Sequence, residues 1–171
     1  MRRGDGGATL ARPADILNDA LLLVRPLAAQ HKVRLVSDAE NAPAILCDRV
    51  QIQQVLVNLI RNAVDAITGA CQTDGVVAIS IRATPDKRVE FSVRDNGPGV
   101  DPDFASKVFE PLATTKPGGL GLGLAISADI VAAHGGRIWL ETSGPGATEF
   151  RFWLSLAMRG NTDASEDGER G

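Results

Sequence analysis

The chain has 171 residues, about the size of one domain, and its 18 basic and 21 acidic side chains give a formal net charge of −3. That charge excludes a nucleic-acid-binding protein that relies on a basic patch. Hydrophobic residues make up 44% of the chain, which excludes global disorder, and the best apolar run, residues 20–29, is too short to cross a membrane.

The apolar periodicities predict a sequence of helices and strands along the chain. Pro13 begins the first helix, Asp48 caps the second, which Gly69 ends, and Gly135 stops the third. In chain order, we expect a helix at about 13–30, short strands at 33–35 and 45–46, a helix at 49–68, strands at 76–83 and 89–94, a loop region at 95–121, a helix at 122–134, and strands at 137–141 and 148–156. This order predicts an α+β fold with helices on one face of a mixed sheet.

The two ends of the chain lack apolar periodicity. We expect residues 1–11 to be a flexible N-terminal segment and residues 158–171 to be an acidic, disordered tail. Cys47 and Cys71 form no CxxC pair, so they predict neither a zinc site nor a disulfide framework. Together with the lack of an apolar leader, this favours a cytoplasmic protein without membrane contact.

The second predicted helix carries a polar stripe on an otherwise apolar surface. Asn58, Asn62 and Asp65 are spaced i, i+4 and i+7, so their side chains lie along one side. One interpretation is that they bond neighbouring loops or face water. The other is a ligand with a hard cation, because amide and carboxylate oxygens suit Mg²⁺.

Two glycine-rich segments follow strands or precede helices. In Asp95-Asn96-Gly97-Pro98-Gly99, the glycines allow a tight turn close to a ligand, and Asp95 can accept a hydrogen bond from an exocyclic amine. The run 114–124, TTKPGGLGLGL, leads into a helix, where exposed backbone N–H groups and the helix dipole favour a phosphate. It is not a Walker A loop, because its lysine is not followed by serine or threonine.

In this order, the segments resemble the GHKL ATP-binding fold, and specifically the catalytic and ATP-binding domain of two-component sensor histidine kinases. Residues 58–66 resemble the N box, 95–99 the first G box, 109–111 the F box, and 119–123 the second G box. The run FEPLATTKPGGLGLGLAIS is similar to kinases of the oxygen-sensing and dicarboxylate-sensing type, although Leu112 and Ala113 replace two aromatic residues that are usual there.

The resemblance implies a two-layer α/β sandwich of the Bergerat type over residues 12–157, with about five strands and three main helices on one face. It implies ATP and Mg²⁺ as ligands, with Asn62 as the metal ligand, Asp95 and Thr148 at the adenine amino group, Lys116 at the terminal phosphate, and Phe109 as a latch for a mobile lid. The implied ATP-binding residues are Asn58, Asn62, Asp65, Asp95, Gly97, Gly99, Thr115, Lys116, Gly119, Gly121, Leu122, Gly123, Leu124 and Thr148.

The same resemblance implies transfer of the γ-phosphate to a histidine. Where gyrase-like ATPases carry a glutamate that activates water, this chain has Asn58, a poor proton acceptor, so we expect no acid or base within the chain and slow hydrolysis. His31 and His134 both stand at predicted helix ends and outside an acceptor motif. We therefore expect the accepting histidine on a separate dimerisation domain of the same or a cognate kinase, with a response regulator as an indirect partner. A serine kinase of the anti-sigma-factor type and a nucleotide-gated interaction module are the alternatives.

Overall fold

The computed structural model describes residues 7–113 and 121–157, which contain seven strands and four helices. The helices are α1 (Pro13–Gln30), α2 (Arg49–Gly69), α3 (Pro102–Ala105) and α4 (Gly123–Ala133). The strands are β1 (Thr9–Ala11), β2 (Arg34–Ala39), β3 (Ile45–Cys47), β4 (Val76–Thr84), β5 (Arg88–Asp95), β6 (Arg137–Gly144) and β7 (Ala147–Ser155).

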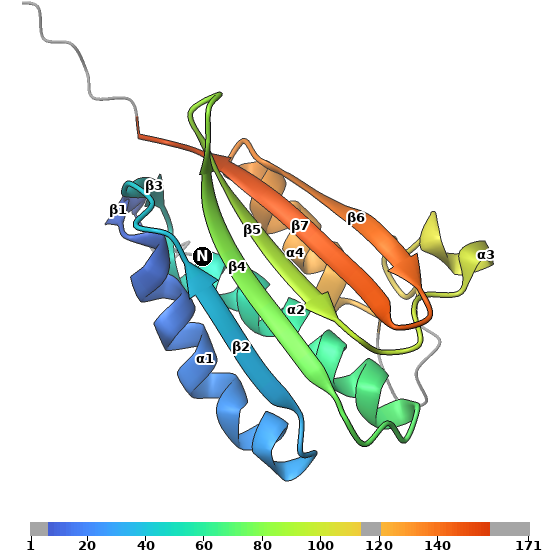
Figure 1. Ribbon diagram of the computed structural model, residues 1–171. Helices are drawn as coiled ribbons and strands as arrows, with labels where there is room; N and C mark the ends of the chain where they lie inside the picture. The colour runs from blue at the N-terminus through green and yellow to red at the C-terminus, as the bar shows by residue number, and fades with distance from the viewer. Residues whose placement is uncertain (1–6, 114–120, 158–171) are drawn as a thin grey trace, which may run out of the picture.

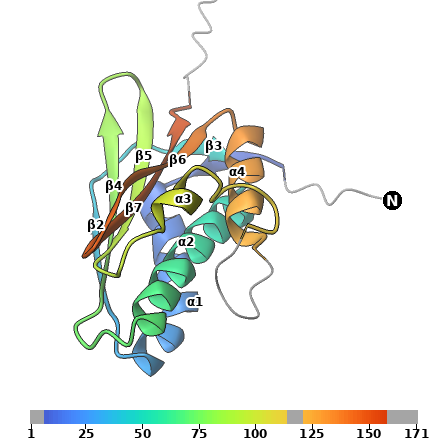
Figure 2. The same cartoon turned by 90° about the vertical axis from the view of Figure 1, so that its right-hand side faces the viewer.

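One mixed sheet forms the first layer of the molecule. Its strand order is β2-β4-β5-β7-β6, with β2 parallel to β4 and the other neighbours antiparallel (Figure 1). Helices α1, α2 and α4 form a second layer on one face of this sheet (Figure 2). The predicted α+β fold, a two-layer sandwich with a five-stranded mixed sheet and three main helices on one face, is therefore confirmed.

The long helices begin and end close to the predicted positions for local chemical reasons. Pro13 occupies the first turn of α1, and the Asp48 side chain accepts a hydrogen bond from the Gln51 N–H at the start of α2. Gly69 is the last residue of α2, as predicted, but the left-handed residue that closes the helix is Cys71, with φ 53°. A side chain at this position costs some backbone strain, which a glycine would avoid.

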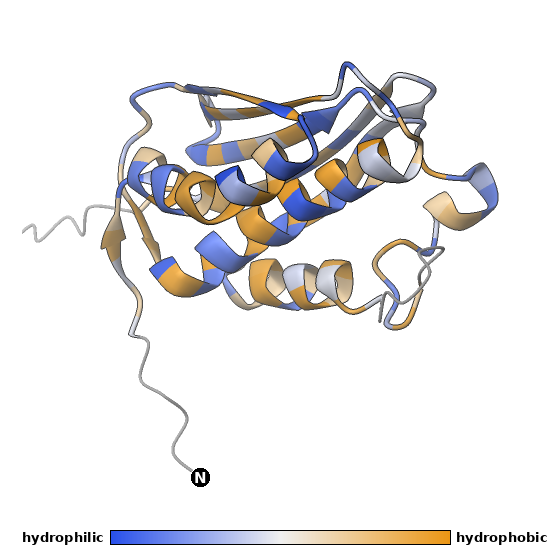
Figure 3. Cartoon of the chain, turned by 90° about the horizontal axis from the view of Figure 1, so that it is seen from below, coloured by the Kyte–Doolittle hydropathy of each residue, from blue (hydrophilic) through white to orange (hydrophobic). Residues whose placement is uncertain are grey.

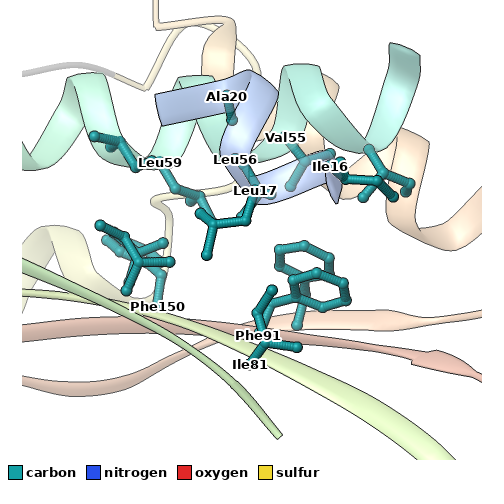
Figure 4. Packing of buried hydrophobic residues seen from close by; sticks show 14 of the residues in the cluster. Ile16, Leu17, Ala20, Val55, Leu56, Leu59, Ile81, Phe91 and Phe150 are labelled. Atoms are coloured by element: carbon teal, nitrogen blue, oxygen red, sulfur yellow. The ribbon is translucent and has the colours of Figure 1, made fainter. Parts of the chain in front are cut away.

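The core lies between the helix layer and the sheet, where the apolar faces of both meet (Figure 3). Leu17 of α1 and Leu56 of α2 point from the helix layer toward Phe91 of β5 (Figure 4), and all three are buried. Phe91 also stacks on Phe152 of β7, with ring centroids 4.5 Å apart. The apolar surface of the second predicted helix therefore packs α2 against the centre of the sheet.

Three details differ from the expected elements. Residues 9–11, placed by the sequence in a flexible N-terminal segment, form β1, because they pair in antiparallel register with β3. The loop region contains the short helix α3, which Asp101 caps by accepting from the Asp103 N–H at 2.9 Å. Strand β2 continues to Ala39, because it pairs with β4 as far as Ile81. Across the described ranges, no helix is both long and apolar enough to span a membrane.

Candidate nucleotide-binding site

An open cavity of about 1020 Å³ lies beside α2, between the ends of β5 and β7 and the start of α4. Its volume is that of a site for a small molecule or cofactor. Nine of the predicted site residues line it: Asn62, Asp65, Asp95, Gly99, Gly121, Leu122, Gly123, Leu124 and Thr148. Thr115, Lys116 and Gly119 lie outside the described residues. The structure thus brings together side chains from four segments that are far apart in the sequence.

Asp95 and Thr148 stand opposite each other at the ends of two neighbouring strands. They are register partners in the β5–β7 pair, and each is only 5% exposed. The Asp95 Oδ1 atom accepts a hydrogen bond from the Gly97 N–H at 2.8 Å. Because this bond orients the carboxylate, Asp95 presents a fixed acceptor group at the inner end of the cavity.

The loop that follows β5 is held on both sides. The Asn96 side chain accepts from the Val76 N–H and donates to the Asp74 carbonyl oxygen, each at 2.8 Å. Gly99 has φ +90°, and a Cβ atom there would lie 2.7 Å from the Gly144 carbonyl oxygen. Only glycine fits this conformation and this close approach to the β6–β7 hairpin. Gly97 does not line the cavity, but its carbonyl oxygen accepts from the Gly146 N–H at 2.8 Å.

Asn58 connects α2 to the first turn of α4. Its Nδ2 group donates to the Gly123 carbonyl oxygen at 3.3 Å and to the Ser127 Oγ atom at 3.2 Å. Ser127 is fully buried and donates to the same carbonyl oxygen at 2.8 Å. Asn58 does not line the cavity, in contrast to its neighbours on the polar stripe. For this residue the structure shows the first interpretation of the stripe, a bond to a neighbouring element, so any contact with a ligand would have to use its side-chain oxygen.

The segment that enters α4 makes a close approach to the end of the F-box region. Gly121 has φ +66°, and a Cβ atom there would lie 2.7 Å from the Leu112 carbonyl carbon. The Leu112 N–H also donates to the Gly121 carbonyl oxygen at 3.1 Å. This contact requires a glycine. The close approach of Gly121 to Leu112 is followed by Leu122, Gly123 and Leu124, which line the cavity. There the N-terminal end of α4 offers backbone N–H groups and partial positive charge.

Phe109 supports one wall of the cavity from behind. Its ring meets Phe150 edge-on, with centroids 5.9 Å apart, and Phe150 lines the cavity while Phe109 does not. Its role as a lid latch stays a prediction.

Several lining residues were not predicted from the sequence. Val93 and Phe150 form apolar walls, and Phe104 with Val108 closes the side next to α3. The sequence contains a signal for this side of the cavity, because Asp101-Pro102 is a capping residue followed by proline, a pattern that is typical of a helix start and predicts α3. Arg61 also lines the cavity, and its spacing from Asn58 and Asp65 already placed it beside the polar stripe.

The oxygen atoms that line the cavity fit a hard cation that is held partly by the protein and partly by the oxygens of a phosphate. Asn62, Asp65 and Asp101 bring amide and carboxylate oxygens to the lining. No group of three or more His, Cys, Asp or Glu side chains in the described part of the chain could hold a metal by itself. Magnesium is commonly bound through one or two protein oxygens plus phosphates and water, which is the arrangement that this lining allows.

The outer side of the β5–β7 strand pair carries an ionic cluster next to Thr148. Glu149 accepts hydrogen bonds from Arg151 Nε at 2.8 Å and from Ser92 Oγ at 2.6 Å, and Arg94 lies 3.9 Å away. Burial raises the pKa of Glu149, but the hydrogen bonds and the two positive charges outweigh it, so the pKa is lowered overall from 4.5. Folding therefore favours the ionised form of Glu149. The contribution of the ionised side chain to the stability of the fold is present above about pH 4.5 and is lost as the pH falls through the lowered pKa.

We expect Glu149→Gln to lower the free energy of unfolding by about 2 kcal/mol at pH 7, because it removes charge-assisted bonds to Arg151 and Ser92. The difference from the unmodified chain shrinks as the pH falls below 4.5 and through the lowered pKa of Glu149, where the carboxylate becomes protonated. Urea unfolding at pH 7 and at a series of pH values below 4.5 measures this difference. Glu110→Gln, at an exposed position, is the matched control. A loss that stayed the same at acid pH would contradict the lowered pKa.

Comparison with known proteins places this site in a family. Residues 47–158 match the family model of the histidine kinase-, DNA gyrase B- and HSP90-like ATPases. The sensor protein FixL of Bradyrhizobium diazoefficiens is 38% identical over 92% of this chain, and the C4-dicarboxylate transport sensor protein DctS of Rhodobacter capsulatus is 35% identical over 86%. The chain spans only 31% of FixL and 22% of DctS.

Solved structures of histidine kinases share this fold. The catalytic domain of histidine kinase ThkA has a TM-score of 0.76 and 28% identity, covering 87% of this chain and 95% of that domain. Full-length ShkA in complex with AMPPNP has a TM-score of 0.76 and 31% identity, over 88% of this chain and 32% of that protein. The chain therefore belongs to the histidine kinase-, DNA gyrase B- and HSP90-like ATPase family, as a catalytic ATPase domain of the sensor histidine kinase type.

Proposed function

We propose that this domain binds Mg-ATP in the cavity beside α2 and transfers the γ-phosphate to a histidine on a dimerisation domain, in two-component signalling in the cytoplasm. The observation that carries the proposal is the arrangement of the cavity, with a buried, oriented carboxylate at one end and the N-terminal end of α4 at the other. The first group suits an amino-substituted base, and the second suits phosphates.

The position of each side chain supports the role predicted for it. Asp95 accepts the adenine amino group with support from Thr148, and Asn62 provides an oxygen ligand for Mg²⁺ between the two ends of the cavity. When bound, Mg²⁺ neutralises charge on the phosphates during transfer. The glycines at 99 and 121 permit the close backbone contacts with Gly144 and Leu112 that shape this cavity. The complex of ShkA with AMPPNP supports a nucleotide as the ligand of this fold.

Transfer is favoured over hydrolysis by the chemistry of Asn58. A base that activates water needs a free acceptor of suitable pKa, whereas the Asn58 side chain is an amide whose Nδ2 group is bound to α4. Phosphoryl transfer depends mainly on positioning and charge neutralisation. A protein acceptor can supply both its nucleophile and the base that activates it.

Neither histidine of this chain is suited to be the acceptor. The His134 Nε2 atom accepts from the Asp48 N–H at 3.1 Å, and its Nδ1 atom lies 2.7 Å from the Ile130 carbonyl oxygen. A carbonyl oxygen only accepts, so Nδ1 carries the proton, and both ring nitrogens are engaged. His31 is the C-terminal cap residue of α1. We therefore place the accepting histidine on the dimerisation domain of the same or a cognate kinase, with a response regulator as the next partner, as ThkA was solved in complex with the response regulator TrrA.

A mixing experiment tests the proposal. The chain is incubated with γ-labelled ATP and Mg²⁺, alone and together with a histidine-containing dimerisation domain of a FixL-like kinase. We expect no label on the chain alone and acid-labile label on the dimerisation domain. The control is the same acceptor with its histidine replaced by glutamine, which stays unlabelled.

Other outcomes point to the alternative functions. Label on His31 or His134 of the isolated chain would contradict transfer in trans. Acid-stable label on a protein acceptor would favour a serine kinase of the anti-sigma-factor type, and ATP binding without any transfer would favour a nucleotide-gated interaction module.

A further inference from the structure

Arg61 is the single cationic side chain among the described residues that line the cavity. The charged residues of this lining are Arg61 and three acids, Asp65, Asp95 and Asp101. A triphosphate is strongly anionic, so an acid-rich lining opposes its binding unless cations compensate. Arg61 is therefore the one described side chain of the lining whose charge attracts the ligand directly.

The position of Arg61 along α2 places it on the phosphate half of the cavity. It lies one helical turn from Asn58, whose Nδ2 group is bonded to Gly123 at the start of α4. The other end of the cavity is farther along the helix, because the loop after Asp95 packs on Ile67, where a Cβ atom on Gly97 would lie 3.5 Å from the Ile67 side chain. Arg61 and Ile67 are six positions apart, or about 9 Å along the helix axis.

The guanidinium group of Arg61 is available for a ligand. The side chain is exposed at the cavity rim. In the part of the chain that the structure describes, no ion pair joins it to another residue, whereas six other arginines are paired with carboxylates: Arg12, Arg49, Arg82, Arg88, Arg94 and Arg151. Its planar fork of donors matches the oxygens of a phosphate.

We propose that Arg61 binds the terminal phosphate of ATP and is one residue by which this site distinguishes ATP from ADP. This inference rests on the proposed function. An arginine that contacts only the γ-phosphate strengthens ATP binding and leaves ADP binding almost unchanged, and it also stabilises the charge that develops on the transferred group.

Calorimetric titration of the full chain with Mg-ATP and Mg-ADP tests the assignment. We expect Arg61→Gln to weaken ATP binding about tenfold, as loss of an exposed charge-assisted contact does, with ADP affinity changed less than twofold. Arg61→Lys keeps the charge without the fork and restores most of the ATP affinity. The control is Arg25→Gln, at an exposed arginine of α1 that does not line the cavity, and it leaves both affinities unchanged.

Three results would overturn the assignment while leaving the proposed function standing. The first is an unchanged ATP affinity in Arg61→Gln, and the second is an equal loss of affinity for ATP and for ADP. The third is a variant that binds ATP normally but transfers less phosphate to the dimerisation domain, which would assign Arg61 to the contact with the protein partner. By contrast, an unmodified chain that bound neither nucleotide would overturn the proposed function itself. The melting temperature of each variant checks folding, which an exposed rim substitution leaves intact.

Discussion

Asp95→Asn is expected to weaken ATP binding about 30- to 100-fold, which corresponds to about 2–3 kcal/mol for a buried acceptor that becomes a donor. The size of the effect follows from the Gly97 N–H, which donates to Asp95 Oδ1. In the variant, the amide oxygen has to keep that position, so the NH₂ group takes the place of Oδ2. Two donors, the amide and the adenine amino group, then face each other. Calorimetric titration with Mg-ATP measures the loss.

The same substitution predicts a change in base selectivity. An NH₂ group at this position can donate to the oxygen that guanine carries in place of the adenine amino group, so the preference for ATP over GTP shrinks. Asp86→Asn, in the exposed β4–β5 turn, is the matched control and leaves both affinities unchanged. An Asp95→Asn variant with wild-type ATP affinity would contradict the role of Asp95 as the acceptor for the adenine amino group.

The parts of the fold that follow from local rules could be predicted from the sequence. The helix from Pro13 to Gln30 and the one from Arg49 to Gly69 have the predicted limits, because proline and a capping aspartate begin them and an apolar stripe at helical spacing runs through each. The strands predicted at 76–83 and 89–94 likewise match β4 and β5 within two residues. Periodicity and capping are properties of neighbouring residues, so they are visible in one sequence.

The parts that depend on distant contacts could not be predicted. Strand β1 forms because Leu10 pairs with Leu46, a partner 36 positions away, and nothing in the glycine-rich N-terminal sequence signals that pairing. The hydrogen bond from Asn58 to Ser127 could not be predicted either, because it depends on α4 lying beside α2. The spacing of the polar stripe could show which side chains share a face, but not which of them meets the cavity and which meets another helix.

Asn62→Ala is expected to remove the magnesium dependence of nucleotide binding and to lower phosphate transfer at least 100-fold, because charge neutralisation and positioning of the phosphates supply most of the rate in this reaction. Asn62 lines the cavity on the same face of α2 as Asp65, where its amide oxygen can serve a cation bound to phosphates. In the unmodified chain, we expect chelation of Mg²⁺ to weaken ATP binding. In the variant, ATP affinities with and without Mg²⁺ become equal.

Two further variants separate a metal ligand from a residue that only supports the fold. Asn62→Asp keeps an oxygen of the same reach, so it retains a magnesium-dependent affinity, whereas a loss of packing would affect both substitutions alike. Asn18→Ala, at an exposed asparagine of α1, changes neither affinity nor transfer. If Asn62→Ala still bound ATP more tightly with Mg²⁺ than without it, the cation would have to be held by other oxygens of the lining, and Asp65 and Asp101 would be the next residues to replace.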